Sequence, residues 1–156
     1  MATTPEELAL DLSQATFDAQ RQTEIKLRDR ATGVLSAASI VVPVAAVAVG
    51  KGPAGAAIMF IVAAVAYVFC ARFCAKTLFP KNFATGIEGG TFLAEAAEAG
   101  ASLRQMQATA AVYLDTMHEG NLPTLERAAA DVKTAIEWLM VEIGALAVAL
   151  AITIAR

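Results

Sequence analysis

Residues 31–74 read ATGVLSAASIVVPVAAVAVG, KGPAG and AAIMFIVAAVAYVFCARFC, and this stretch decides the fold. No charged residue occurs in 31–50 or in 54–71, and Lys51 is the only charged residue between these two segments. A helix rises ~1.5 Å per residue, so about 20 apolar residues cross a bilayer core of ~30 Å. A soluble chain of 156 residues has no interior that hides two adjacent helices apolar on every side. The stretch therefore predicts a transmembrane hairpin, residues 31–75, with spans 31–50 and 54–74.

The composition of the whole chain agrees with a membrane protein. Hydrophobic residues make up 57% and charged residues 17%, whereas soluble domains carry about 25% charged residues. The net charge of −3 argues against nucleic-acid binding, which needs a basic face.

The first 30 residues predict an amphipathic cytoplasmic helix. Thr4 is expected to cap it, with Pro5 at its first position and Glu7 completing a capping box. The helix either runs into the first span or bends just before it. Its apolar residues Leu8, Leu12, Ala15 and Ala19 fall on one face, with Phe17 beside it.

Residues 76–137 predict a cytoplasmic antiparallel helical hairpin. Its first helix begins near Thr91, Glu119-Gly120-Asn121 breaks it, and Leu122-Pro123 starts the second. Apolar residues recur at heptad steps along both helices, which is typical of a packing seam. The seam either forms the core of the hairpin or assembles copies of the chain and recruits partners. Its main positions are Leu103, Met106, Tyr113, Met117, Leu125 and Val132, with Phe92, Ala96, Ala99, Ala110, Ala129, Ile136 and Leu139 alongside.

Residues 138–156 predict a third span. Trp138 suits the membrane interface, and from there to Ala155 only Glu142 is charged. The predicted fold class is all-α, an integral membrane protein with three transmembrane helices and a cytoplasmic helical hairpin. Segments that flank membrane spans on the cytoplasmic side carry an excess of Lys and Arg, which predicts a cytoplasmic N-terminus and Arg156 on the outer side. The charges on which this orientation depends are Arg21, Lys26, Arg28, Arg30, Arg72, Lys76 and Lys81.

Glu142 is the leading candidate for a functional residue, because burying an acid inside a membrane costs at least a few kcal/mol. It either extends to the headgroups or lines a water-filled path, and a pair with Arg72 is conceivable from their similar depth. Pro43 either packs locally or acts as a hinge. Ser36 and Ser39 of the first span complete the set of pore or gating candidates.

No motif predicts catalysis, a metal site or a cofactor. Cys70 and Cys74 lie one helical turn apart, which suits either helix packing or acylation near the membrane surface. His118 is the only histidine, and it is expected to be exposed near the hairpin turn. Nucleophile elbows and phosphate-binding glycine loops are absent from the sequence. We therefore expect a protein that is not an enzyme.

The order of these parts resembles the SLATT-type effectors and the related transmembrane effectors of Pycsar-like antiviral systems in bacteria. The likeness rests on Lys26 and Arg28–Arg30 before the first span, on Leu78-Phe79-Pro80 after the second, and on Asn121 with Lys133 before the last helix. The Pycsar type also carries a nucleotide-binding domain, and no segment of this sequence resembles one.

The resemblance implies a function at the bacterial inner membrane. It implies a homo-oligomeric effector that forms pores or disrupts the membrane in antiviral or stress defence, with membrane lipids and an upstream nucleotide-signal or sensor protein as partners. The alternative is a passive membrane scaffold that recruits a cytoplasmic partner through the helical hairpin.

Overall fold

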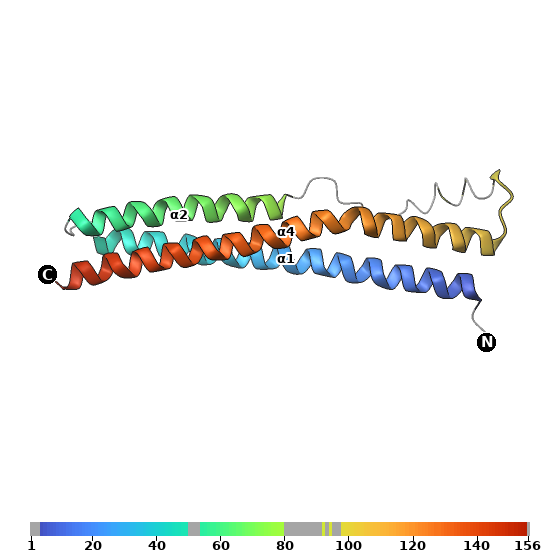
Figure 1. Cartoon of the computed structure of the whole chain (residues 1–156), viewed down its shortest axis with the longest axis horizontal. Helices are drawn as coiled ribbons and strands as arrows, with labels where there is room; N and C mark the ends of the chain where they lie inside the picture. Colours follow the sequence, from blue (N-terminus) through green and yellow to red (C-terminus); the bar gives the residue numbers. More distant parts are fainter. Residues whose placement is uncertain (1–3, 50–53, 80–91, 93, 95–97, 156) are drawn as a thin grey trace. The chain divides into compact units, whose positions relative to one another are not determined.

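The chain is all-helical in the part that the structure describes. The computed structural model describes residues 4–49, 54–79, 92, 94 and 98–155, with the side chains of 41–50 outside that description. Within these residues three long helices form, α1 (Pro5–Val49), α2 (Ala54–Leu78) and α4 (Leu103–Ile154) (Figure 1). The predicted all-α class is confirmed.

The chain divides into two compact units. The first unit comprises Met1–Ile25 and Lys81–Glu126, and the second comprises Lys26–Pro80 and Arg127–Arg156. Each is described by itself below.

The start of α1 follows the predicted capping box. The Thr4 backbone N–H donates to the Glu7 carboxylate at 3.4 Å, and the Glu7 N–H donates to the Thr4 hydroxyl at 3.3 Å. These two bonds satisfy amide groups that the first helical turn leaves without intrahelical partners. The helix then continues to Val49, which confirms that the N-terminal helix runs into the predicted first span.

The first unit contains the N-terminal parts of α1 and α4, which run parallel. Ser13 of α1 contacts Asp115 of α4, and Gln20, two turns further along, contacts His118. Phe17 and Leu114 are buried in this unit. The apolar face of α1 predicted from Leu8, Leu12, Ala15 and Ala19 is exposed.

The predicted break at Glu119-Gly120-Asn121 is wrong, and with it the helical hairpin of residues 76–137. α4 is one helix of 52 residues that passes through Gly120 and contains Pro123 in its interior. A proline removes one backbone hydrogen bond, but Asn121 is buried in the first unit and holds this segment against Gln20 of α1. Packing therefore overrides the local signals for a break.

Phe92, Ala94 and Glu98 are helical, near the predicted helix start at Thr91, but this helix does not run on through Gly100 as predicted, and α4 begins after it. Gly100 adopts a φ of 62°, a left-handed conformation that glycine accepts at little cost. Ser102 then caps α4, because its hydroxyl accepts from the Gln105 N–H at 3.4 Å while its own N–H donates to the Gln105 side chain at 2.8 Å. The helix consequently begins at Leu103.

In the second unit α2 and α4 run antiparallel. Ala56 packs on Ala149, and Ala63 packs on Ala145 and Leu146. The C-terminal part of α1 lies alongside them (Figure 1). Small side chains at these contacts let the helix backbones approach closely, as in membrane proteins.

Two helices, α2 and α4, are long and apolar enough to cross a membrane. Residues 31–49 of the predicted first span, 31–50, form the last part of α1, and the side chains of 41–50 lie outside the described residues. Three spans therefore stay a prediction.

Candidate functional site

Glu142 is enclosed in the second unit. Its exposed fraction is 0%, and neither carboxylate oxygen has a hydrogen-bond partner among the residues that the structure describes. Ala135 and Ala149, seven residues before and after it on α4, are equally buried. Helix positions seven apart lie on the same side of a helix, so Glu142 occupies the packed face of α4.

A titratable side chain of α2, Cys70, interacts with Glu142. The Cys70 thiol lies within electrostatic range of the Glu142 carboxyl, and the Cys70 and Cys74 side chains lie within hydrogen-bonding reach of each other. Both thiols are free and fully buried. Thiols are weak donors and weak acceptors, so these side chains compensate little of the cost of burying a carboxylate.

The structure does not bring the predicted site residues together. Glu142 does not extend to the headgroups, and the pair with Arg72 is not formed, because the glutamate is fully enclosed while Arg72 is exposed. Ser36 and Ser39 are also exposed, and the Ser39 hydroxyl donates to the Leu35 carbonyl at 2.7 Å.

Two further expectations concern Pro43 and the cysteines. Pro43 belongs to α1, and its side chain lies outside the described residues. Cys70 and Cys74 have no exposed surface in the described arrangement, so acylation of either thiol would require the helices to separate. The packing role is the one that the structure supports for both thiols.

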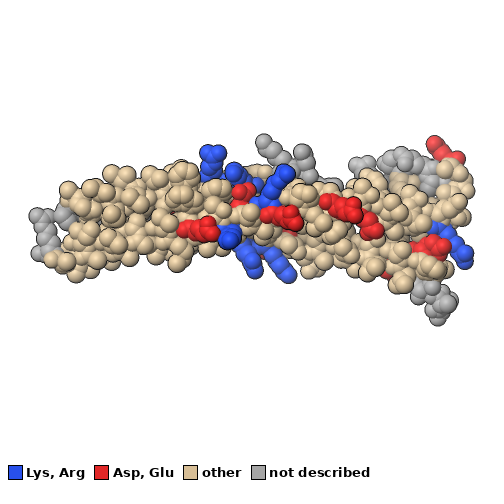
Figure 2. Space-filling view, viewed as in Figure 1, with Lys and Arg blue, Asp and Glu red and all other residues tan. Residues whose placement is uncertain are grey.

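Charged residues begin where the apolar parts of α2 and α4 end. Lys76 pairs with Asp131 at 3.9 Å and lies 4.6 Å from the ring centre of Phe73. Two turns closer to the apolar part, Phe69 stacks on Trp138 with ring centres 4.7 Å apart. Figure 2 shows no coloured charge over the end of this unit that holds the start of α2 and the end of α4. The order from aromatic to charged residues is that of a membrane interface.

The stacked pair gives a prediction. We expect Phe69→Leu to destabilise the second unit by about 1 kcal/mol, because an aromatic pair contributes about 0.5–1.5 kcal/mol beyond its buried area. Since Trp138 is the only tryptophan, its fluorescence during thermal unfolding in detergent measures the effect. Phe79→Leu, at an exposed phenylalanine, is the matched control. Equal losses in the two variants would show that the stacking contributes nothing.

The first unit contains a polar layer that the sequence pattern did not predict. Gln20 donates to the His118 carbonyl at 2.9 Å and accepts from the Asn121 amide at 3.5 Å. Gln20 and Asn121 are buried, and His118 is half-buried rather than exposed as expected. The sequence contains one signal for this layer, because residues seven apart lie on the same side of a helix. Ser13 and Gln20 have this spacing on α1, and Leu114 and Asn121 have it on α4.

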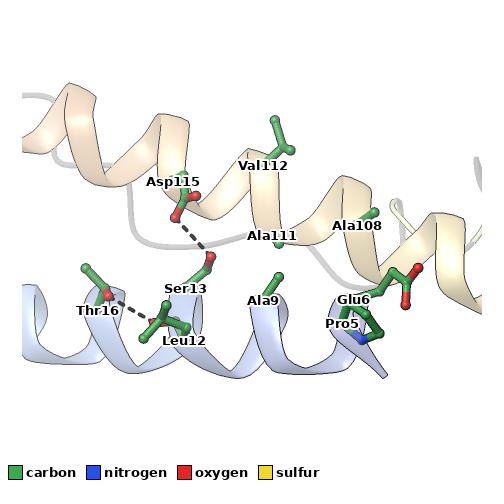
Figure 3. A pocket seen from close by; sticks show the side chains of 10 residues that line it. All are labelled: Pro5, Glu6, Ala9, Leu12, Ser13, Thr16, Ala108, Ala111, Val112 and Asp115. Atoms are coloured by element: carbon green, nitrogen blue, oxygen red, sulfur yellow. Dashed lines mark hydrogen bonds between the residues drawn. The ribbon is translucent and has the colours of Figure 1, made fainter. Parts of the chain in front are cut away.

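An open groove of about 470 Å³ lies between α1 and α4 in the first unit. Figure 3 shows Ser13 directed toward Asp115, to which its hydroxyl donates at 2.9 Å. The side chains of Leu12 and Val112 form apolar parts of the lining.

The predicted heptad seam is one residue out of phase with the buried face of α4. Leu103 is 70% exposed and Tyr113 is 48% exposed, whereas Ala111 and Leu114 are buried. Of the other seam positions, Val132 is buried, while Met106, Met117 and Leu125 are half-buried. The seam is therefore wrong as a core at Leu103 and Tyr113, and it stays a prediction as an assembly surface.

Within the described ranges, no three His, Cys, Asp or Glu side chains come together to hold a metal ion. Comparison of the chain with protein-family models, curated proteins and solved structures found no match.

Proposed function

We propose that the second unit spans a membrane and that the chain forms a homo-oligomeric pore, as the resemblance to bacterial defence effectors implies. Large apolar side chains point outward from both candidate spans, which suits contact with lipid rather than water. Those on α2 and the end of α4 include Ile58, Ile61, Val68, Met140, Val148 and Ile154.

The observation that carries the proposal is the enclosed carboxyl of Glu142. A buried acid without a partner lowers stability by several kcal/mol, and leucine would fit an apolar helix contact better. A carboxyl at this position can contribute to function only in a second state, in which α2 and α4 separate and water reaches Glu142. We interpret the described arrangement as the closed state of a pore.

Flux through liposomes tests this function. We expect purified protein in liposomes to release potassium ions and a small dye, and Glu142→Leu to change the flux by about tenfold, the equivalent of 1.4 kcal/mol. Glu137→Leu, at an exposed glutamate on the same helix, is the matched control. The mass of each variant in detergent separates a loss of flux from a loss of assembly.

Sealed liposomes and a monomeric protein would contradict the pore. They would favour the second candidate function, a membrane scaffold, for which the exposed side chains of Leu103, Val112 and Tyr113 on α4 are suitable contacts. A scaffold predicts that Leu103→Asp and Met106→Asp abolish partner binding while Glu142→Leu has no effect.

A further inference from the structure

We infer that Glu142 is a proton-binding residue, which holds a proton while the second unit is closed and releases it when the helices part. The inference rests on the proposed function, because the release requires an open state. The proton-bound state itself follows from the surroundings of the carboxyl.

The surroundings of Glu142 offer no positive charge that would compensate an ionised carboxylate among the described residues. Among the described residues, neither carboxylate oxygen of Glu142 accepts a hydrogen bond, so the Tyr67 hydroxyl and the Cys70 thiol of α2 do not bind it. The sequence has no charged residue in 31–49 of α1, and Glu142 is the only charged residue between Trp138 and Ile154 of α4. An ionised carboxylate without a partner costs far more to bury than a neutral carboxylic acid.

The surroundings of Glu142 suit a proton better than a metal cation. Hard cations in proteins take about six or more oxygen ligands, whereas a proton needs only the carboxylate that binds it. The described residues contribute no group of three His, Cys, Asp or Glu around Glu142. Backbone carbonyls within α2 and α4 are already used by helical hydrogen bonds. The chemistry of this enclosure therefore fits a proton.

Loss of the Glu142 proton would also favour separation of α2 from α4. Glu142 of α4 and Cys70 of α2 lie close enough to interact electrostatically, and both have no exposed surface. Loss of the proton would place a negative charge in an apolar contact, which favours separation of the two helices and entry of water. Cys70 would become accessible in the same event.

Dicyclohexylcarbodiimide, an apolar reagent that can enter from the bilayer during brief openings of the enclosure, tests the proton-bound state. The carboxyl proton moves to a nitrogen of this apolar reagent and the carboxylate oxygen bonds to its central carbon. The adduct then rearranges to a stable N-acylurea with no leaving group. Only a protonated carboxyl reacts in this way, and an exposed glutamate with its ordinary pKa of about 4.3 is ionised at neutral pH.

We expect the full-length protein in liposomes to gain about one reagent per chain at about pH 7.5, located by fragment masses at Glu142. Glu142→Gln is expected to lose this modification and Glu137→Gln to keep it. An unmodified wild-type chain, or a reagent spread over the exposed carboxyls, would overturn the proton-bound state. The wild-type fragment masses decide this point even if Glu142→Gln does not fold.

The release is tested by thiol accessibility. In a Cys74→Ala background we expect a water-soluble maleimide to label Cys70 more rapidly as the pH rises, and to a greater degree than in the same background with Glu142→Gln. Identical pH profiles would overturn the coupling. Modification of Glu142 in a monomeric protein whose liposomes stay sealed would keep the proton site and reject the pore, whereas leaking liposomes without modification would keep the pore and reject the proton site.

Discussion

Ala149→Phe should lower the melting temperature of the protein by about 2–12 °C. Ala149 and its partner Ala56 have exposed fractions of 0%, and Met59, Phe60 and Ile152 pack around them. A phenyl ring at this contact forces α2 away from α4, and overpacking of this kind costs about 1–3 kcal/mol. In a chain of this size each kcal/mol shifts the melting temperature by about 2–4 °C.

The measurement is thermal unfolding in detergent, followed by helical circular dichroism. Ala151→Phe adds the same ring two residues further along α4, where the side chain is exposed, and is expected to leave the melting temperature unchanged. A control variant as unstable as Ala149→Phe would mean that α2 does not pack on this face of α4.

Gln20→Leu is expected to weaken the first unit by about 1–3 kcal/mol. The substitution removes the donor to the His118 carbonyl and the acceptor of the Asn121 amide. Loss of one partner in a buried polar contact carries this cost, whereas replacing both partners with apolar groups is nearly neutral.

Hydrogen exchange of the backbone amides in residues 13–25 and 111–121 reports this change locally, because it measures the free energy of opening in each segment. Gln22→Leu provides the control, since it is the same substitution on an exposed position of α1. Exchange that is as fast in the control as in Gln20→Leu would reject a stabilising role for the polar layer.

The elements predicted correctly from the sequence are those that depend on neighbouring residues. The capping box of Thr4 and Glu7 spans four positions, and its hydrogen bonds are those expected. The apolar character of α2 is likewise a property of one continuous segment. Such features need no knowledge of which helix packs on which.

The wrong predictions involve contacts between distant residues. Gly120 and Pro123 are local signals for a helix end, but α4 is continuous through both, and Asn121 in this segment meets Gln20 about a hundred residues away in the chain. A buried face identified only from apolar residues also misses positions where polar side chains are buried, as in the first unit. Because Gln20 and Asn121 occupy buried positions, the apolar seam through Leu103 and Tyr113 was one residue out of phase.

Glu142 shows the same division between local and distant information. Its place within an apolar segment is evident from the sequence, but the direction of its side chain depends on which face of α4 is packed. The burial of Ala135 and Ala149 fixes that face. A sequence in which alanines occupy most faces of the helix does not distinguish them.

The burial of both cysteines has a practical consequence for mapping the topology of the chain. Cys70 and Cys74 are the only cysteines in the sequence, and neither has exposed surface. A membrane-impermeant thiol probe therefore finds no target on the closed natural chain. A single cysteine introduced at an exposed position, such as Gln14 on α1 or Ala155 after α4, becomes the only reactive site. The side of the bilayer from which it is labelled then reads out the orientation of that segment without altering the native thiols.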